Sequence, residues 1–97
     1  MPAYVIAFVD ASDEQRYAQD YVPPVLELVN QYGGRLLCAA DTIQLKEGTW
    51  PKGRTVVIEF PDMETAESWY HSEAYRPLLE MRGSFAESIL ALVPGVS

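Results

Sequence analysis

A strand pattern followed directly by a helix pattern occurs twice in this chain, and this repeat constrains the fold most. The first copy reads AYVIAFVD and then SDEQRYAQDYVPPVLELVNQYGG, and the second reads RTVVIEF, PD and METAESWY. Each copy closes with a further apolar run, RLLCAA in the first and SILALV in the second. Together they give the order β-α-β-β-α-β, which is the split βαβ arrangement of an α+β protein. We therefore expect an antiparallel four-stranded sheet with two helices on one face.

Four segments have the composition of strands, and we expect them over residues 4–9, 35–40, 54–60 and 88–93. The linker from Asp41 to Gly53 is longer than a tight hairpin needs, and it predicts a short strand extension around Ile43 and Leu45. No linker or shift in composition divides the chain. Residues 1–97 are therefore expected to form one domain.

The two helices carry recognisable start and stop signals. Ser12 precedes Gln15 by three residues, the spacing of a capping box that opens a helix. Pro23 and Pro24 fall inside this helix and predict a kink or restart, because proline lacks an N–H and clashes with the preceding turn. Gly33 suits the left-handed position that ends it. The second helix is expected to begin after the capping residue Asp62, to pause near residues 71–72 and to restart over residues 75–81.

The charge balance argues against one class of partner. The chain has 14 acidic and 7 basic residues, which gives a formal net charge of −7. Nucleic-acid-binding proteins neutralise phosphates with clustered lysines and arginines, whereas the basic residues here are scattered and outnumbered. We therefore expect no affinity for nucleic acid and none for an anionic membrane surface.

Other common signals are also missing from the sequence. Cys38 is the only cysteine, which excludes an intrachain disulfide. One histidine and one cysteine far apart do not make a zinc site, and no Gly-rich run opens a helix after a strand, so we expect no metal and no cofactor. The N-terminus lacks the basic start of a signal peptide, and no apolar run approaches the ~20 residues that span a bilayer. These features predict a soluble cytoplasmic protein.

The first and last strands are apolar on both faces. Tyr4, Ile6 and Phe8 alternate with three small apolar residues in the first strand, and the last strand has the same character. Two helices cover only one face, so the other face needs a second cover. A second copy of the chain supplies it most simply, and we expect a two-fold homodimer with facing sheets.

Five motifs, read in order, resemble a known family. They are YGGRLL (32–37), EGTWP (47–51), VVIEFPD (56–62), ESWYHSEAY (67–75) and LVPGV (92–96). Over nearly the whole chain they resemble the small bacterial domain-of-unknown-function family numbered thirteen-thirty. The resemblance implies the dimeric α/β-barrel group, whose ferredoxin-like subunits pair through their sheets. Relatives by fold include cofactor-independent monooxygenases and muconolactone isomerases, although fold alone does not transfer an activity.

His71 and Glu59 are the candidate catalytic residues. His71 is the only histidine, and its unperturbed pKa lies near neutrality, so it is either a general base or a solvent-facing residue at a helix break. Glu59 lies among apolar neighbours in the third strand. If it points inward it must be paired or protonated, because a lone buried carboxylate is costly. Arg35, Arg54 and Arg82 are its candidate partners.

The candidate ligand-binding residues are aromatic or cationic and are shared with the resembling family: Trp69, Tyr70, Tyr75, Arg82, Arg35 and Trp50. The aromatics either line a cleft between helix and sheet for a small organic ligand or fill the core and dimer interface. Arg82 is suited to hold an anionic or carbonyl group of such a ligand. Two hypotheses follow: a homodimer that binds a small organic molecule, or a cofactorless isomerase or monooxygenase-like enzyme.

Overall fold

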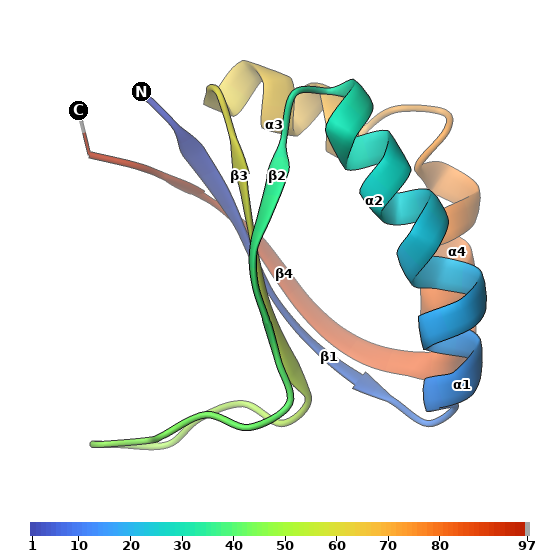
Figure 1. Cartoon of the computed structure of the whole chain (residues 1–97), viewed down its shortest axis with the longest axis vertical. Helices are drawn as coiled ribbons and strands as arrows, with labels where there is room; N and C mark the ends of the chain where they lie inside the picture. Colours follow the sequence, from blue (N-terminus) through green and yellow to red (C-terminus); the bar gives the residue numbers. More distant parts are fainter. Residues whose placement is uncertain (97) are drawn as a thin grey trace.

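The structure is a computed structural model that describes residues 1–96, and its sheet has the order β2-β3-β1-β4 (Figure 1). Every neighbouring pair of strands is antiparallel. The strands are β1 (Ala3–Ala11), β2 (Arg35–Ala40), β3 (Arg54–Phe60) and β4 (Ala86–Pro94). The predicted four-stranded antiparallel sheet and the ferredoxin-like order of elements are therefore confirmed.

The first helical segment changes its hydrogen-bond pattern midway. It runs from α1 (Glu14–Arg16) through a π-helical turn η1 (Tyr17–Tyr21) into α2 (Val22–Gln31). The N–H of Val22 bonds to the carbonyl oxygen of Tyr17, the i→i−5 pattern. Prolines occupy the first turn of α2, where a missing N–H costs little. The predicted restart at the prolines is confirmed: α2 begins directly after the π-helical turn and has both prolines in its first turn.

The second helical segment is divided as predicted into α3 (Met63–Tyr70) and α4 (Arg76–Phe85). Asp62 caps α3, and its Oδ1 accepts a hydrogen bond of 2.7 Å from the N–H of Thr65. Between the two helices, Ser72 donates from Oγ to the carbonyl oxygen of Trp69 at 2.8 Å and accepts from the N–H of Tyr75 at 3.2 Å. This serine turn connects α3 to α4.

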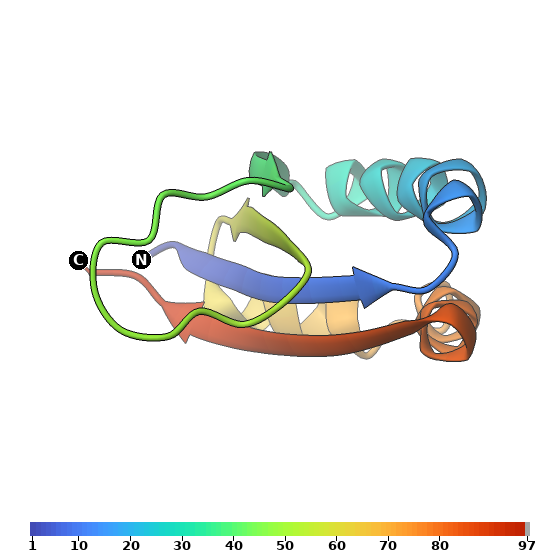
Figure 2. The same cartoon turned by 90° about the horizontal axis from the view of Figure 1, so that it is seen from below.

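The helices lie on one side of the sheet, on the right in Figure 1, and Figure 2 shows α2 and α4 side by side. On β1, Val5, Ala7 and Val9 face these helices and are buried. The alternate residues of β1 belong to the opposite face and stay half-buried. That open face also exposes Ile89 (57%) on β4, so both faces of the sheet are apolar as expected.

Two local predictions are wrong. Asp13, not Ser12, caps the first helix: its Oδ1 accepts from the N–H of Arg16 at 3.0 Å, while the Oγ of Ser12 donates to the carbonyl oxygen of Phe85. The segment around Ile43 and Leu45 forms no strand, and the loop between β2 and β3 extends away from the sheet (Figure 1). Residues of this loop form no backbone ladder with any strand of the described chain, so they do not continue the sheet.

Candidate functional site

A cavity of about 60 Å³ lies between the helices and the buried face of the sheet. The strands contribute the apolar side chains Val5, Ala7, Val9, Leu36, Ala39, Val56, Ile58 and Leu90. The helical segments contribute Tyr21, Val22, Val25, Leu26, Trp69, Tyr75 and Arg82. Leu36 and Ala39 are exposed on the edge strand β2, so the cavity approaches solvent there. The lining contains no carboxylate, histidine or cysteine.

Three polar side chains form one cluster at this cavity. The Nη1 of Arg82 donates to the hydroxyl oxygens of Tyr21 at 3.1 Å and Tyr75 at 3.0 Å. The two hydroxyl oxygens are themselves 3.0 Å apart and share a hydrogen bond. Tyr21 ends the π-helical turn, and Tyr75 stands two helical turns before Arg82, on the same face of α4. The cluster therefore ties both helical segments together behind the cavity.

Arg82 remains a cation in this environment. It is 8% exposed and forms no ion pair with the described residues. Burial acts to lower the pKa of its guanidinium, but the two tyrosine hydroxyls that accept its hydrogen bonds outweigh burial, and the pKa is raised. A buried cation without an anionic partner is costly and uncommon in a protein interior.

Tyr75 is a neutral hydrogen-bonding group. It is 0% exposed, and burial is the main cause that raises the pKa of its hydroxyl well above the ordinary value. Its ring packs against Trp69 with ring centroids 4.4 Å apart. Trp69 is 1% exposed, and its indole Nε1 has no hydrogen-bond partner among residues 1–96. The Trp69 side chain lines the cavity, while its N–H is buried away from the open space and donates to none of these residues.

The structure brings together three of the predicted site residues, namely Trp69, Tyr75 and Arg82. Glu59 instead belongs to the open face of the sheet, where its carboxylate accepts a hydrogen bond of 2.8 Å from Nε of Arg35. Of the three candidate partners, Arg35 is the one found, because β2 and β3 place it directly opposite Glu59 in the register. Neither residue lines the cavity.

His71 also lies outside the cavity. Its side chain is 68% exposed and its Nε2 lies 3.0 Å from the carboxylate of Glu67 one helical turn earlier. It borders a surface hollow of about 320 Å³ together with Tyr70, where the end of α3 meets Leu90 and Leu92 of β4. The two catalytic candidates therefore lie apart from the Arg82 cluster, His71 at the end of α3 and Glu59 on the open face of the sheet. A catalytic role for either residue stays a prediction.

Trp50 is on the long loop and is 44% exposed. Its indole stacks edge-on against Phe8 with centroids 5.4 Å apart, and its Nε1 donates to Oγ1 of Thr55 at 3.3 Å. Phe8 belongs to the open face of the sheet, so Trp50 extends that apolar face and does not reach the cavity.

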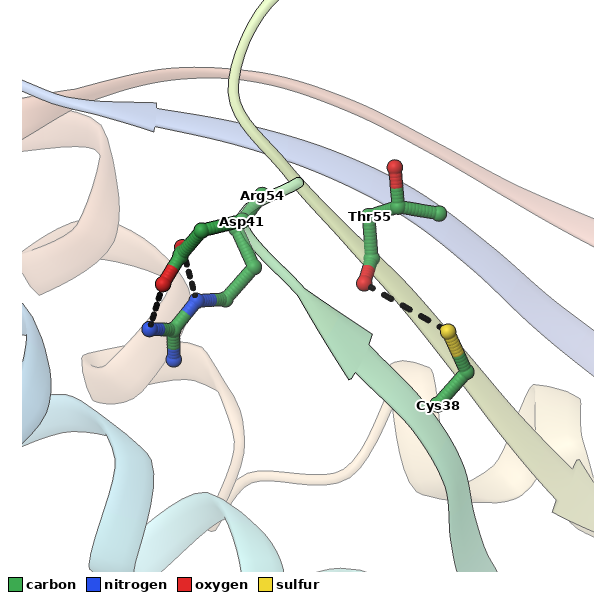
Figure 3. A network of polar contacts seen from close by, with 4 residues as sticks. All are labelled: Cys38, Asp41, Arg54 and Thr55. Carbon is green, nitrogen blue, oxygen red and sulfur yellow. Dashed lines mark hydrogen bonds and ion pairs between the residues drawn. The ribbon is translucent and has the colours of Figure 1, made fainter. Parts of the chain in front are cut away.

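A second polar cluster lies at the far end of β2 and β3 (Figure 3). Arg54 donates from Nε and Nη2 to the carboxylate of Asp41 at 2.9 and 3.0 Å, and this pair lowers the pKa of Asp41. Nearby, Sγ of Cys38 lies 4.0 Å from the carbonyl oxygen of Thr55. A hollow of about 480 Å³ adjoins Arg54, but the guanidinium of Arg54 is already paired with the carboxylate of Asp41. No group of histidine, cysteine and acidic residues within the described chain has the arrangement of a metal site.

The sequence of the chain matches one family over residues 2–96, and that family is described as Domain of unknown function (DUF1330). The chain belongs to the DUF1330 family. No curated protein matches it. In the described residues, no helix has the length and apolar character needed to cross a membrane.

Solved structures share the fold at low sequence identity. A protein of unknown function from Rhodopseudomonas palustris, RPA0582, is 15% identical with a TM-score of 0.74, over 99% of this chain and 83% of that one. An antibiotic biosynthesis monooxygenase is 19% identical with a TM-score of 0.56, over 98% and 99%. SnoaB, a cofactor-independent oxygenase from Streptomyces nogalater, is 10% identical with a TM-score of 0.64, over 99% and 93%. These likenesses establish the ferredoxin-like fold of this DUF1330 protein.

Proposed function

We propose that this DUF1330 protein is a homodimer that binds a small organic molecule in the cavity between the helices and the sheet. The observation that carries the proposal is the Arg82 cluster: a buried cation and two tyrosine hydroxyls at one apolar cavity. A protein interior built for stability alone avoids such a cation, because apolar replacements are often as stable or more so. Apolar walls with a few convergent polar groups are typical of small-molecule sites.

The homodimer rests on the open face of the sheet. This face carries Tyr4, Ile6 and Phe8 on β1, which are cross-strand neighbours of Ile89, Ala91 and Val93 on β4. The side chain of Ile89 leaves more than half of its surface in water. A contiguous exposed apolar patch of this kind marks a protein interface, and a two-fold axis lets the same patch cover itself.

Sedimentation velocity at micromolar concentration tests the homodimer. The wild-type protein is expected to sediment with twice the mass of the chain, and Ile89→Asp is expected to sediment as a monomer, because a carboxylate in the interface cannot be desolvated cheaply. Gln31→Asp, an exposed change at the end of α2, is the charge-matched control and should stay dimeric. A monomeric wild type would remove the basis for the homodimer.

NMR tests ligand binding in the cavity. The chain has two tryptophans, so its ¹H–¹⁵N spectrum contains two indole signals, one from Trp69 at the cavity and one from Trp50 outside it. Titration with butyrate, butyramide and 1-butanol should move the Trp69 signal and leave the Trp50 signal in place. Ala7→Leu fills the cavity with a larger side chain and should abolish the response. A Trp69 signal that responds to none of the three compounds would refute the site.

A cofactorless enzyme is the second candidate. The feature that favours it is the same cluster, because pre-positioned donors from Arg82, Tyr21 and Tyr75 stabilise an oxygen that gains negative charge during a reaction. SnoaB, which shares the fold, is a cofactor-independent oxygenase. A cavity lining without carboxylate, histidine or cysteine, however, offers no general base at neutral pH. This absence within the lining favours binding over catalysis.

A further inference from the structure

The hydrogen bonds of the cluster leave donors unused and leave few acceptors. Both hydrogen bonds of Arg82 leave from Nη1, and its Nε and Nη2 groups make none to residues 1–96. Tyr21 and Tyr75 share one hydrogen bond, so one hydroxyl donates to the other. The accepting hydroxyl then keeps its own O–H without an acceptor among the described side chains, since each hydroxyl carries a single proton.

Trp69 adds a third kind of unused donor. Its indole N–H is buried at 1% exposure, has no partner among residues 1–96, and belongs to a side chain that lines the same cavity. An indole nitrogen donates and does not accept. The indole N–H has no surface open to the cavity, so the donors that a ligand can reach here are the guanidinium and one hydroxyl. A ligand that satisfies them must bring acceptors.

The positive charge of this site also favours a ligand that brings acceptors. Arg16, Arg35 and Arg54 each lie within 4.0 Å of a carboxylate. Arg82 is the most buried of these four arginines, yet it has no carboxylate partner in the described chain, although the protein carries 14 acidic residues. Because no carboxylate of the described chain neutralises Arg82, its charge is available to an anionic ligand.

The size of the cavity limits that anion. A water molecule needs roughly 10–15 Å³ of such space. A cavity of about 60 Å³ therefore admits roughly four to six water-sized groups. Apart from the cluster, its walls are aliphatic or aromatic, so only one end of the ligand is polar.

We propose that the ligand is a short-chain monocarboxylate, with its carboxylate at Arg82, Tyr21 and Tyr75 and its aliphatic chain against the walls from β1 and α2. This inference rests on the proposed function and names the chemical class of its ligand. A carboxylate is an acceptor with two oxygens and matches the planar, forked guanidinium, whereas an amide of the same size brings a competing donor and no charge.

The test compares butyrate with butyramide, which has nearly the same size and no charge. Dissociation constants come from the Trp69 indole signal, with sodium chloride at equal concentration as the ionic-strength control. We expect butyrate to bind at least tenfold more tightly than butyramide, and chloride to leave the signal unchanged. Equal affinities for the two compounds, or an equal response to chloride, would overturn the carboxylate assignment while the proposed cavity remained.

Arg82→Met removes the cation and keeps a side chain of similar length. We expect this variant to lose at least tenfold in affinity for butyrate and to bind butyramide within twofold of the wild type. Arg76→Met, an exposed change on the same helix, changes the net charge equally and should bind butyrate as the wild type does. If Arg82→Met does not fold, the ratio of butyrate to butyramide affinity in the wild type decides. A butyrate affinity that Arg82→Met leaves intact would overturn the proposal.

Discussion

Tyr75→Phe is the sharpest test of the buried cluster, because it removes one oxygen and leaves the ring in place. That oxygen accepts a hydrogen bond of 3.0 Å from Arg82 and shares one of 3.0 Å with Tyr21. Tyr75 is fully buried, so water does not readily replace the lost partner. A hydrogen bond to a charged group contributes about 1.5–3 kcal/mol, and we expect the variant to lose about 2 kcal/mol of unfolding free energy. For a domain of this size the corresponding fall in Tm is roughly 8–16 °C.

A double-mutant cycle with Arg82→Met separates the ionic contribution from the loss of the hydroxyl. Once the cation is gone, the Tyr75 hydroxyl keeps only its neutral bond to Tyr21, which contributes about 1 kcal/mol. Tyr75→Phe should then cost about half as much in the Arg82→Met background as in the wild type. Urea unfolding at one fixed protein concentration measures all four free energies, since dimerisation makes apparent stability depend on concentration. Equal costs in the two backgrounds would refute the coupling between Arg82 and Tyr75.

Two further predictions concern the packing and the caps that hold the site. Gly34→Ala should lower the unfolding free energy by about 1–3 kcal/mol, because its new Cβ would lie 2.7 Å from Phe60 Cε1 and 2.8 Å from Val29 Cγ1. Gly83→Ala is the control and should not destabilise the protein, because its new Cβ would have nothing within 4 Å. The urea midpoints of the two variants are compared. For Asp62, hydrogen bonds from Thr65 lower the carboxyl pKa below 3.8, so its charge stabilises the fold above that value and ceases to do so as the pH falls through the lowered pKa. The Tm difference between wild type and Asp62→Asn should therefore shrink below about pH 3.8, and a difference that stays constant to pH 2 would contradict this.

The fold was predictable because its signals are local. The strand patterns, the prolines in the first turn of α2, Gly33 at φ 75° and the cap Asp62 each depend on residues close in sequence. The two-sided apolar character of β1 also follows from alternation alone, and the structure confirms it. The wrong strand around Ile43 has the opposite origin, since a strand needs a partner that only the folded chain supplies or withholds.

The candidate site was only half predictable. Trp69, Tyr75 and Arg82 were candidate ligand-binding residues, and the structure places all three at one cavity because they lie close together in the second helical segment. Tyr21 was not among the predicted site residues, because its contact with Nη1 of Arg82 joins two helical segments that are 61 residues apart in the sequence. His71 gave the strongest chemical signal in the sequence, but a residue type does not reveal which side of a helix break it faces.

We propose the cavity between the helices and the sheet as the ligand site of this protein. A crystal structure of the wild-type protein with butyrate tests it most directly, with Ala7→Leu crystals treated in the same way as the control. We expect electron density for butyrate inside the wild-type cavity, with a carboxylate oxygen within hydrogen-bond distance of the Arg82 guanidinium, and an empty site in Ala7→Leu. Butyrate bound only beside His71, only on the open face of the sheet, or nowhere on the protein would contradict it.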